Sequence, residues 1–145
     1  MKKKMLFFTA IILSVVILFV FYSNNKISKP ENRRIKRISD IVISILFLIF
    51  YPLIILLIDN KLNFIKNVFL VLRGKYSWVG YLPYVNVGNL KLPEIKKGII
   101  PPLNYASFNK DESFRINAQY ASNYNLTDDI YIIYKAFSKI GNKNL

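Results

Sequence analysis

Residues 36–60 have the sequence KRISDIVISILFLIFYPLIILLIDN, and this stretch decides the fold that we expect. After two cations and Asp40, an apolar run extends from residue 41 to residue 58, with Ser44 and Pro52 inside it. A run of this length is typical of a helix in hydrocarbon. Proline removes a backbone hydrogen bond, and in hydrocarbon the freed carbonyl needs another partner. The pattern therefore predicts either a kinked spanning helix or a re-entrant helix that turns back at Pro52.

A second apolar run, residues 5–22, follows the basic start Lys2, Lys3 and Lys4. It has about 18 residues, which is just enough for a helix to cross the hydrocarbon core. No small-residue cleavage site follows it. We therefore expect an uncleaved transmembrane anchor over residues 1–22, with a cleaved signal peptide as the alternative.

The charge balance is strongly basic, with 21 Lys and Arg against 8 Asp and Glu and a net charge of +13. Such a balance indicates nucleic acid or an anionic lipid surface as partner, and the two apolar runs favour lipid over nucleic acid. Cations are numerous on both sides of the run at 41–58, so a re-entrant helix, which keeps both sides in the cytoplasm, agrees better with the positive-inside tendency. The cations that we expect to contact anionic lipid are Lys26, Lys29, Arg33, Arg34, Lys36, Arg37, Lys66 and Arg73. For the cations before residue 38, the alternative is a basic linker that is solvated and does not contact lipid.

The remainder of the chain predicts shorter elements. Residues 61–73 form an amphipathic pattern that suits a helix lying in the headgroup plane or covering a small protein core, and both interpretations stay open. Gly74 is a plausible end for that helix. Residues 75–109 are rich in Gly, Pro and aromatics, which is typical of loops with short extended pieces. Helices follow at 111–122 and from Thr127, the expected N-cap, to about residue 140.

The residue inventory excludes several kinds of catalytic site. The chain has no cysteine and no histidine, which excludes Cys/His zinc sites and nucleophiles activated by an imidazole. The adjacent carboxylates at Asp111-Glu112 and at Asp128-Asp129 are interpreted as favourable charges in the first turns of helices. We therefore assign no catalytic residue, no metal site and no cofactor from the sequence.

Four segments, in this order, resemble the bacterial sugar transferase family, the monotopic phosphoglycosyl transferases that act on polyprenyl phosphate. The first is KRISD at 36–40 with the proline-containing apolar run behind it; the second is LVLRGKYSWVGYLP at 70–83, which resembles N-V-L-K-G-D-M-S-L-V-G-P-R-P. The third is IKKGI at 95–99, similar to V-K-P-G-I, and the fourth is YASNYNLTDDI at 120–130, similar to Y-V-x-N-W-S-L-x-x-D-L. The matched positions are Lys36, Arg37, Asp40, Pro52, Gly74, Ser77, Gly80, Pro83, Gly98 and Asp129.

The chain departs from this family at the positions that would carry catalysis. The family's Asp-Glu dyad falls at Asn63 and Phe64, and its phosphate-gripping arginine falls at Leu82. Phosphoryl transfer depends on positioned charge and metal, which an amide, a phenyl ring and an aliphatic chain do not supply. The resemblance therefore implies a shortened, catalytically inactive member, and Mg²⁺ would be expected only if the chain were an active enzyme.

The expected fold is that of a mainly α membrane protein. It comprises an anchor (1–22), a basic linker (23–38), a re-entrant membrane helix (39–59) and a small helical and irregular sugar-transferase-like interfacial domain (60–145). By the resemblance, it would lie at the bacterial inner membrane with its C-terminal domain in the cytoplasm and assist surface polysaccharide or glycolipid assembly. The lipid bilayer, polyprenyl phosphate and a glycosyltransferase are the expected partners. An active or split phosphoglycosyl transferase and an unrelated small subunit of an envelope complex are the alternative functions.

Overall fold

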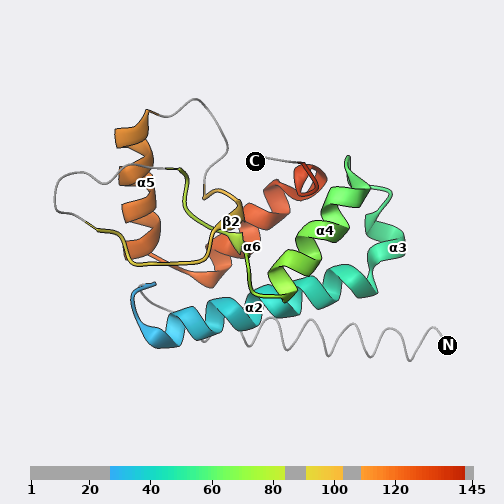
Figure 1. The fold of residues 1–145 in the computed structure, drawn as a ribbon, viewed down its shortest axis with the longest axis horizontal. Coiled ribbons are helices and arrows are strands. Elements are labelled where there is room, and N and C mark those ends of the chain that lie inside the picture. The colour runs from blue at the N-terminus through green and yellow to red at the C-terminus, as the bar shows by residue number, and fades with distance from the viewer. Residues whose placement is uncertain (1–26, 84–90, 103–108, 143–145) are drawn as a thin grey trace.

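The computed structural model describes residues 27–83, 91–102 and 109–142. The predicted anchor at 1–22 and the cation Lys26 lie outside these residues. The described part is mainly helical with one small sheet, in the order α2 (Pro30–Ile49), α3 (Tyr51–Ile54), α4 (Lys61–Leu72), β1 (Ser77–Val79), β2 (Gly98–Ile100), α5 (Lys110–Ser122), α6 (Leu126–Lys135) and the 3₁₀ turn η1 (Phe137–Lys139) (Figure 1).

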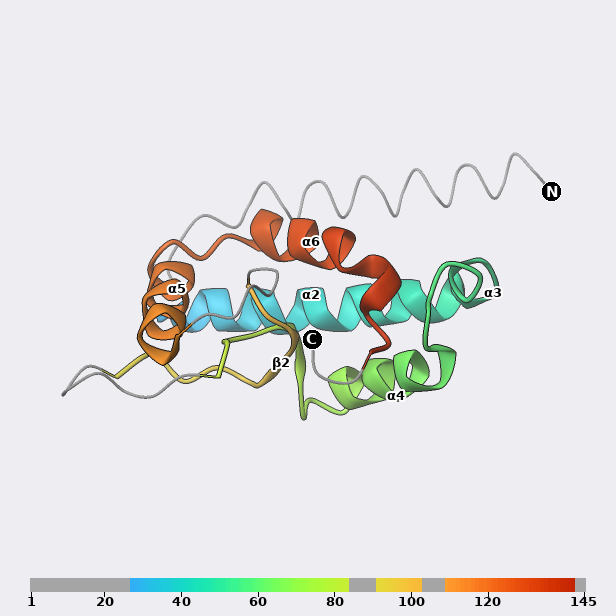
Figure 2. The same ribbon diagram turned by 90° about the horizontal axis from the view of Figure 1, so that it is seen from above.

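Helix α2 is the base on which the other elements lie. In Figure 1, α4, β2, α6 and α5 are all on one side of it. Seen from above, α6 runs along one flank of α2 and α4 along the other (Figure 2). Pro30 is the first residue of α2. The first N–H groups of a helix have no carbonyl partner within that helix, so a proline, which lacks the N–H, costs no hydrogen bond at this position. The helix ends at Phe50, whose φ of −90° and ψ of 8° leave the helical range.

The apolar run at 41–58 is divided by its proline. Pro52 lies in the first turn of α3, where proline is tolerated, and a new short helix therefore starts there instead of α2 continuing. After α3, the chain turns at residues 55–57 and returns along α2 as α4 (Figure 1). The chain therefore reverses direction after Pro52, but as the separate helices α3 and α4 and not as the predicted re-entrant membrane helix.

The prediction of a membrane fold is wrong for this part of the chain. Within residues 27–83, 91–102 and 109–142, no helix combines the length and the apolar character needed to cross a bilayer. The physical reason is that the longest helix, α2, has charged residues through its first half, from Glu31 to Asp40, and that the break at Phe50 cuts the apolar run short. A kinked spanning helix over residues 41–58 is excluded for the same reason.

Helix α4 covers the core rather than lying free of it. Its residues Phe64, Val68 and Val71 are buried against α2 and the sheet. The Asn60 side chain caps its start by accepting a hydrogen bond from the backbone N–H of Asn63 (3.2 Å). Gly74 ends the helix with a φ of +76°, a conformation that glycine adopts without steric cost. Of the two interpretations open for this helix, the structure supports the covering of a protein core.

The sheet is a parallel pair in which Ser77 is opposite Gly98 and Val79 is opposite Ile100. Two glycines permit this pairing. A Cβ atom built on Gly98 would lie 2.0 Å from the backbone nitrogen of Gly80, and one built on Gly80 would lie 2.2 Å from that of Gly98. The strands, α2, α4 and α6 enclose a core centred on Trp78 and Phe47, whose rings meet edge to face at 5.1 Å.

The C-terminal helices differ slightly from their predicted bounds. Helix α5 begins one residue before the predicted start and ends at Ser122 as expected. Helix α6 is capped by Asn125, whose side chain accepts from the N–H of Thr127 (3.1 Å), so the prediction of Thr127 as the cap is wrong. The expected single helix to about residue 140 is also divided, because Ala136 leaves helical geometry and η1 follows it.

Candidate functional site

A buried ion pair joins the inner face of α2 to α6. The ammonium Nζ of Lys36 donates to Oδ2 of Asp129 and to the hydroxyl of Tyr120 (3.0 Å). That hydroxyl donates in turn to Oδ1 of Asp129 (2.6 Å), and the hydroxyl of Tyr124 donates to Oδ2 (3.3 Å). The rings of Tyr120 and Tyr124 also lie within 5.7 and 5.4 Å of the ammonium. One carboxylate therefore holds α2 to the α5–α6 region, which lies 84 to 93 positions later in the chain.

The electrostatics of this group keep its tyrosines neutral. Burial raises the pKa of Tyr120 and of Tyr124 well above the ordinary value, and the negative charge of Asp129 raises both further. The carboxylate of Asp129 already accepts from an ammonium and two hydroxyls, so its lone pairs are largely used. The arrangement fixes helices and supplies no free base or nucleophile.

Asp40, one helical turn beyond Lys36 on the same face, binds β1. Its Oδ1 accepts from the backbone N–H of Trp78 (3.1 Å), while the indole Nε1 donates to the hydroxyl of Ser44 (3.0 Å). Burial raises the pKa of Asp40, and the nearby charge of Lys36 opposes this rise, as do the neighbouring Ser77 hydroxyl and the Trp78 N–H. The Ser77 hydroxyl is itself buried beside this carboxylate.

The positions matched to the sugar transferases mostly meet in this region. Lys36 pairs with Asp129, and the carboxylate of Asp40 lies against β1. A further pair is formed by the backbones of Gly80 and Gly98. Pro52 and Pro83 lie on exposed parts of the chain and join none of these pairs.

Arg37 and Gly74 meet on the outer side of this group. The guanidinium of Arg37 donates to the carbonyls of Val71 (2.6 Å) and Leu72 (2.9 Å) at the C-terminal end of α4, where the Val71 carbonyl also accepts from the N–H of Gly74 (2.9 Å). The ammonium of Lys96 lies 2.9 Å from the point that a Cβ of Gly74 would occupy, and a guanidinium nitrogen of Arg37 lies 3.1 Å from the same point. Two cations thus adjoin one glycine. Across the described residues, the only ion pair is that of Lys36 with Asp129.

The cations expected to contact lipid do not share one environment. Lys29, Arg33, Arg34, Lys66 and Arg73 are exposed. Arg37 is half-buried and its terminal nitrogens bind the end of α4. Lys36 is only 5% exposed and bonded to Asp129, so the prediction that it contacts lipid is wrong. Its charge is required inside the fold.

An apolar surface covers the outside of α2 and α3 and part of α4. On α2 the exposed residues Ile38, Ile45, Leu48 and Ile49 share one face. The leucines of α3 and the turn after it, together with two residues of α4, extend this surface. We call the whole set the aliphatic surface: Ile38, Ile45, Leu48, Ile49, Leu53, Leu56, Leu57, Leu62 and Phe69.

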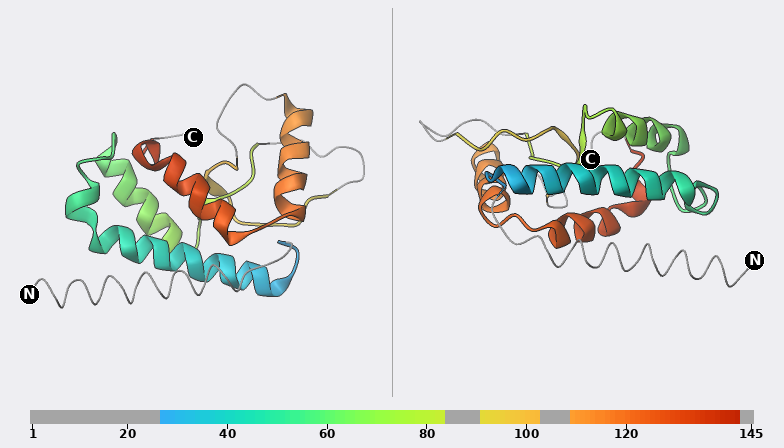
Figure 3. Two further views of the ribbon diagram at one scale, coloured as in Figure 1. Left: turned by 180° about the vertical axis from the view of Figure 1, so that it is seen from behind. Right: turned by 90° about the horizontal axis from the view of Figure 1, so that it is seen from below.

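Helix α2 is inverted, in the sense that its polar side chains are buried and its aliphatic side chains are exposed. Its buried face carries Asn32, Lys36, Ser39, Asp40 and Ser44 besides Phe47, whereas its exposed face carries isoleucines and leucine. Seen from below, α2 crosses the middle of the molecule between α4 and α6 (Figure 3). Sequence reasoning missed this inversion, although the signal was present: Lys36, Asp40 and Ser44 recur every fourth residue and so share a face.

The positions of the missing dyad and arginine lie in structural surroundings. Phe64 is 1% exposed in the core, and Asn63 lies in the first turn of α4. Leu82 is buried, and its backbone N–H and carbonyl bind the amide of Asn117 (both 2.9 Å). In the acidic pair on α5, the Glu112 carboxylate accepts from the backbone N–H of Asn109 (3.1 Å), as expected for a helix start.

Comparison of the chain with protein-family models, with curated proteins and with solved structures finds no match.

Proposed function

We propose that this chain is a non-catalytic protein, similar in parts of its sequence to sugar transferases, that binds the surface of an anionic lipid leaflet. It would assist surface polysaccharide or glycolipid assembly there, on the cytoplasmic side of the bacterial inner membrane. The observation that carries the proposal is the aliphatic surface on the inverted helix α2. Contact with the lipid surface is sufficient for this role, and none of the described helices needs to cross the bilayer.

The size and form of the aliphatic surface support an apolar partner. Its residues continue from one face of α2 through α3 onto α4, with Leu56 77% and Leu62 83% exposed. Exposed apolar side chains gathered on three consecutive helices in this way indicate a site that another molecule or a lipid phase covers. Burying polar residues while exposing aliphatic ones costs free energy in water, and contact with hydrocarbon recovers it.

The composition of this surface favours lipid over a protein partner. Eight of its nine residues are Ile or Leu and one is Phe. Protein interfaces are enriched in aromatic residues, Met and Arg at their centres, and this surface contains neither Tyr, Trp, Met nor Arg.

Exposed cations complement an anionic lipid. Arg34 lies on the same face of α2 as Ile38 and Ile45, about one turn before Ile38. Lys61 and Lys66 are exposed on α4, beside Leu62 and Phe69. Cations near an anionic leaflet each contribute about 1 kcal/mol to binding, so an apolar face with a cationic border is typical of a peripheral lipid-binding surface.

A depth measurement tests this proposal. The chain has no cysteine, so a single introduced cysteine carries a fluorophore at one known place. With the label at Leu56→Cys, anionic vesicles should shift the emission to the blue, and nitroxides on the lipid chains should quench it. Tyr134→Cys is the matched control, because Tyr134 is 76% exposed but lies on α6, outside the aliphatic surface. Its emission should not change.

Two results would overturn the lipid assignment. One is a label at residue 56 that stays in water although the full chain is bound to the vesicles. The other is a label already shielded without vesicles, which would mean that another part of the chain or a second copy covers the surface.

The non-catalytic part of the proposal is tested by incubating the full chain in vesicles with polyprenyl phosphate and nucleotide sugars. No sugar phosphate should be transferred, and lipid-linked product would contradict the proposal.

A further inference from the structure

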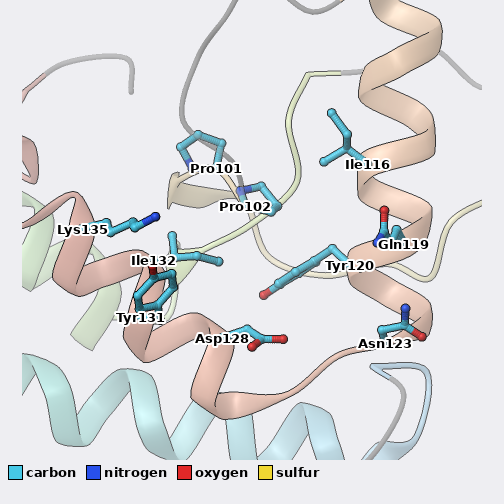
Figure 4. A pocket seen from close by; sticks show the side chains of 10 residues that line it. All are labelled: Pro101, Pro102, Ile116, Gln119, Tyr120, Asn123, Asp128, Tyr131, Ile132 and Lys135. Atoms are coloured by element: carbon cyan, nitrogen blue, oxygen red, sulfur yellow. The ribbon is translucent and has the colours of Figure 1, made fainter.

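A cleft of about 550 Å³ lies between α5, α6 and the segment after β2, apart from the aliphatic surface. Figure 4 shows Ile116, Gln119 and Asn123 along α5 on one side of it, with Pro101 and Pro102 on the segment after β2 and Asp128 at the start of α6. The remaining lining residues are Tyr120, Tyr131, Ile132 and Lys135. The cleft is thus lined by apolar side chains, polar side chains and two aromatic rings.

The charges in the cleft nearly cancel. Among the lining residues, Asp128 carries the only carboxylate and Lys135 the only ammonium. This balance contrasts with the net charge of +13 of the whole chain. A site for phosphate groups would be expected to gather cations, which this protein has in excess elsewhere. The lining therefore suits a ligand without net charge.

The Tyr120 ring is held by residues outside the cleft, and the Tyr131 ring is contacted by Lys135 of the cleft lining. The hydroxyl of Tyr120 is bonded to Asp129 and to Lys36, so its ring has a fixed position at the cleft wall. The Lys135 ammonium lies 4.6 Å from the centre of the Tyr131 ring. Tyr131 is nevertheless 54% exposed, which leaves ring surface for a ligand. Rings fixed in this way lose little conformational freedom on binding.

We propose that this cleft binds a neutral carbohydrate. A sugar ring has an apolar C–H face that packs on tyrosine and proline, and a rim of hydroxyls that need both donors and acceptors. The amides of Gln119 and Asn123 supply both, and the Asp128 carboxylate supplies strong acceptors. The proposal is independent of lipid binding, because none of the lining residues belongs to the aliphatic surface.

The test is saturation-transfer NMR with maltotriose and with N-acetylglucosamine trimer as the probes. The full chain is kept in a detergent that has no sugar headgroup, because a maltoside would compete. We expect transfer from the protein to at least one of these probes. Tyr131→Ala removes a stacking ring and Asp128→Asn removes the charged acceptor; each should weaken binding about tenfold. Tyr134→Ala is the matched control, an exposed tyrosine of the same helix outside the cleft, and should bind as the unaltered chain does.

Four outcomes would overturn the proposal. They are no transfer to either probe, an equal loss of binding in Tyr134→Ala, tighter binding of glucose 1-phosphate than of the neutral probes, and tighter binding of a proline-rich peptide. Circular dichroism of each variant confirms that the fold is intact. Since the lipid-depth measurement uses residue 56 and this one uses residues 128 and 131, failure of either proposal leaves the other measurable.

Discussion

At the scale of single residues, the Lys36–Asp129 pair is the interaction on which the fold depends most. Replacing Lys36 by Met would leave a buried carboxylate without its countercharge. We expect this change to lower the free energy of unfolding by about 3–5 kcal/mol, because an unpaired charge in the interior keeps its desolvation cost. Urea unfolding of the full chain, followed by the fluorescence of the single tryptophan, Trp78, measures this.

The double variant Lys36→Met with Asp129→Leu is the control. It removes the unpaired charge as well, so it should be more stable than Lys36→Met alone, although the hydroxyls of Tyr120 and Tyr124 lose their acceptor. A double variant as unstable as, or less stable than, the single one would show that the ion pair is not the source of the loss.

Asp40 gives the stability a pH dependence of known sign. Burial raises its pKa above the ordinary value of 3.8, so the folded state holds the proton more tightly than the unfolded state. Its stabilising contribution is therefore present below pH 3.8 and is lost as the pH rises through the folded-state pKa. Asp40→Asn keeps an oxygen that can accept from the Trp78 N–H and removes the charge. The variant should gain stability relative to the unaltered chain between pH 4 and 7, as measured by urea unfolding at each pH; a constant difference would contradict this.

The residue scale also shows what sequence reasoning could not supply. Asp129 was interpreted as a favourable charge in the first turn of a helix, and it does lie in the first turn of α6. Its buried partner is 93 positions earlier in the chain, a pairing that no local pattern encodes. The same holds for Lys36, because a lysine in a basic segment is ordinarily solvated, and only the complete fold buries it.

At the scale of elements, the close backbone contact in the parallel strand pair requires glycine. A Cβ on Gly98 would meet the backbone of Gly80 at 2.0 to 2.4 Å, and backbone cannot rotate away as a side chain can. Gly98→Ala should therefore lower the free energy of unfolding by about 3 kcal/mol or more. Lys97→Ala, at the exposed neighbouring position, should change it by no more than about 0.5 kcal/mol in the same urea titration. Equal effects of the two changes would exclude the steric explanation.

The positions of the helices along the chain could be predicted from the sequence, but the packing of each helix against its neighbours could not. The pattern at 61–73 predicted α4 to within a residue, and Gly74 ends it as expected. Propensity and capping determine such local features. The apolar run at 41–58 was interpreted from its length and apolar content, and that interpretation overlooked how Lys36, Asp40 and Ser44 divide α2 into a polar inner face and an apolar outer face. The single sequence also holds no pattern that would place Tyr120 of α5 and Tyr131 of α6 around one cleft.

At the scale of the whole molecule, the exposed cations and the aliphatic surface predict a directional lipid affinity. Arg34 and Lys66 border the aliphatic surface, whereas Arg115 is exposed on α5. Helix α5 lies on the side of α2 on which the other elements pack, away from the exposed outer face of α2 (Figure 1). If the outer face of α2 lies on the leaflet, α5 is on the far side of α2 from the lipid charges, and attraction between charges falls off within a Debye length. The three cations should therefore not be equivalent.

Arg34→Gln and Lys66→Gln should each weaken binding to anionic vesicles about fivefold, since each removes a contribution of about 1 kcal/mol at the lipid surface. Arg115→Gln makes the same change in net charge and should have little effect. Vesicle flotation at several salt concentrations measures all three, and added salt should reduce the difference because it screens the surface charge. An equal loss in the three variants would mean that lipid responds only to the net charge of the chain. The aliphatic surface would then not orient the molecule, because an oriented molecule must distinguish its near cations from its far ones.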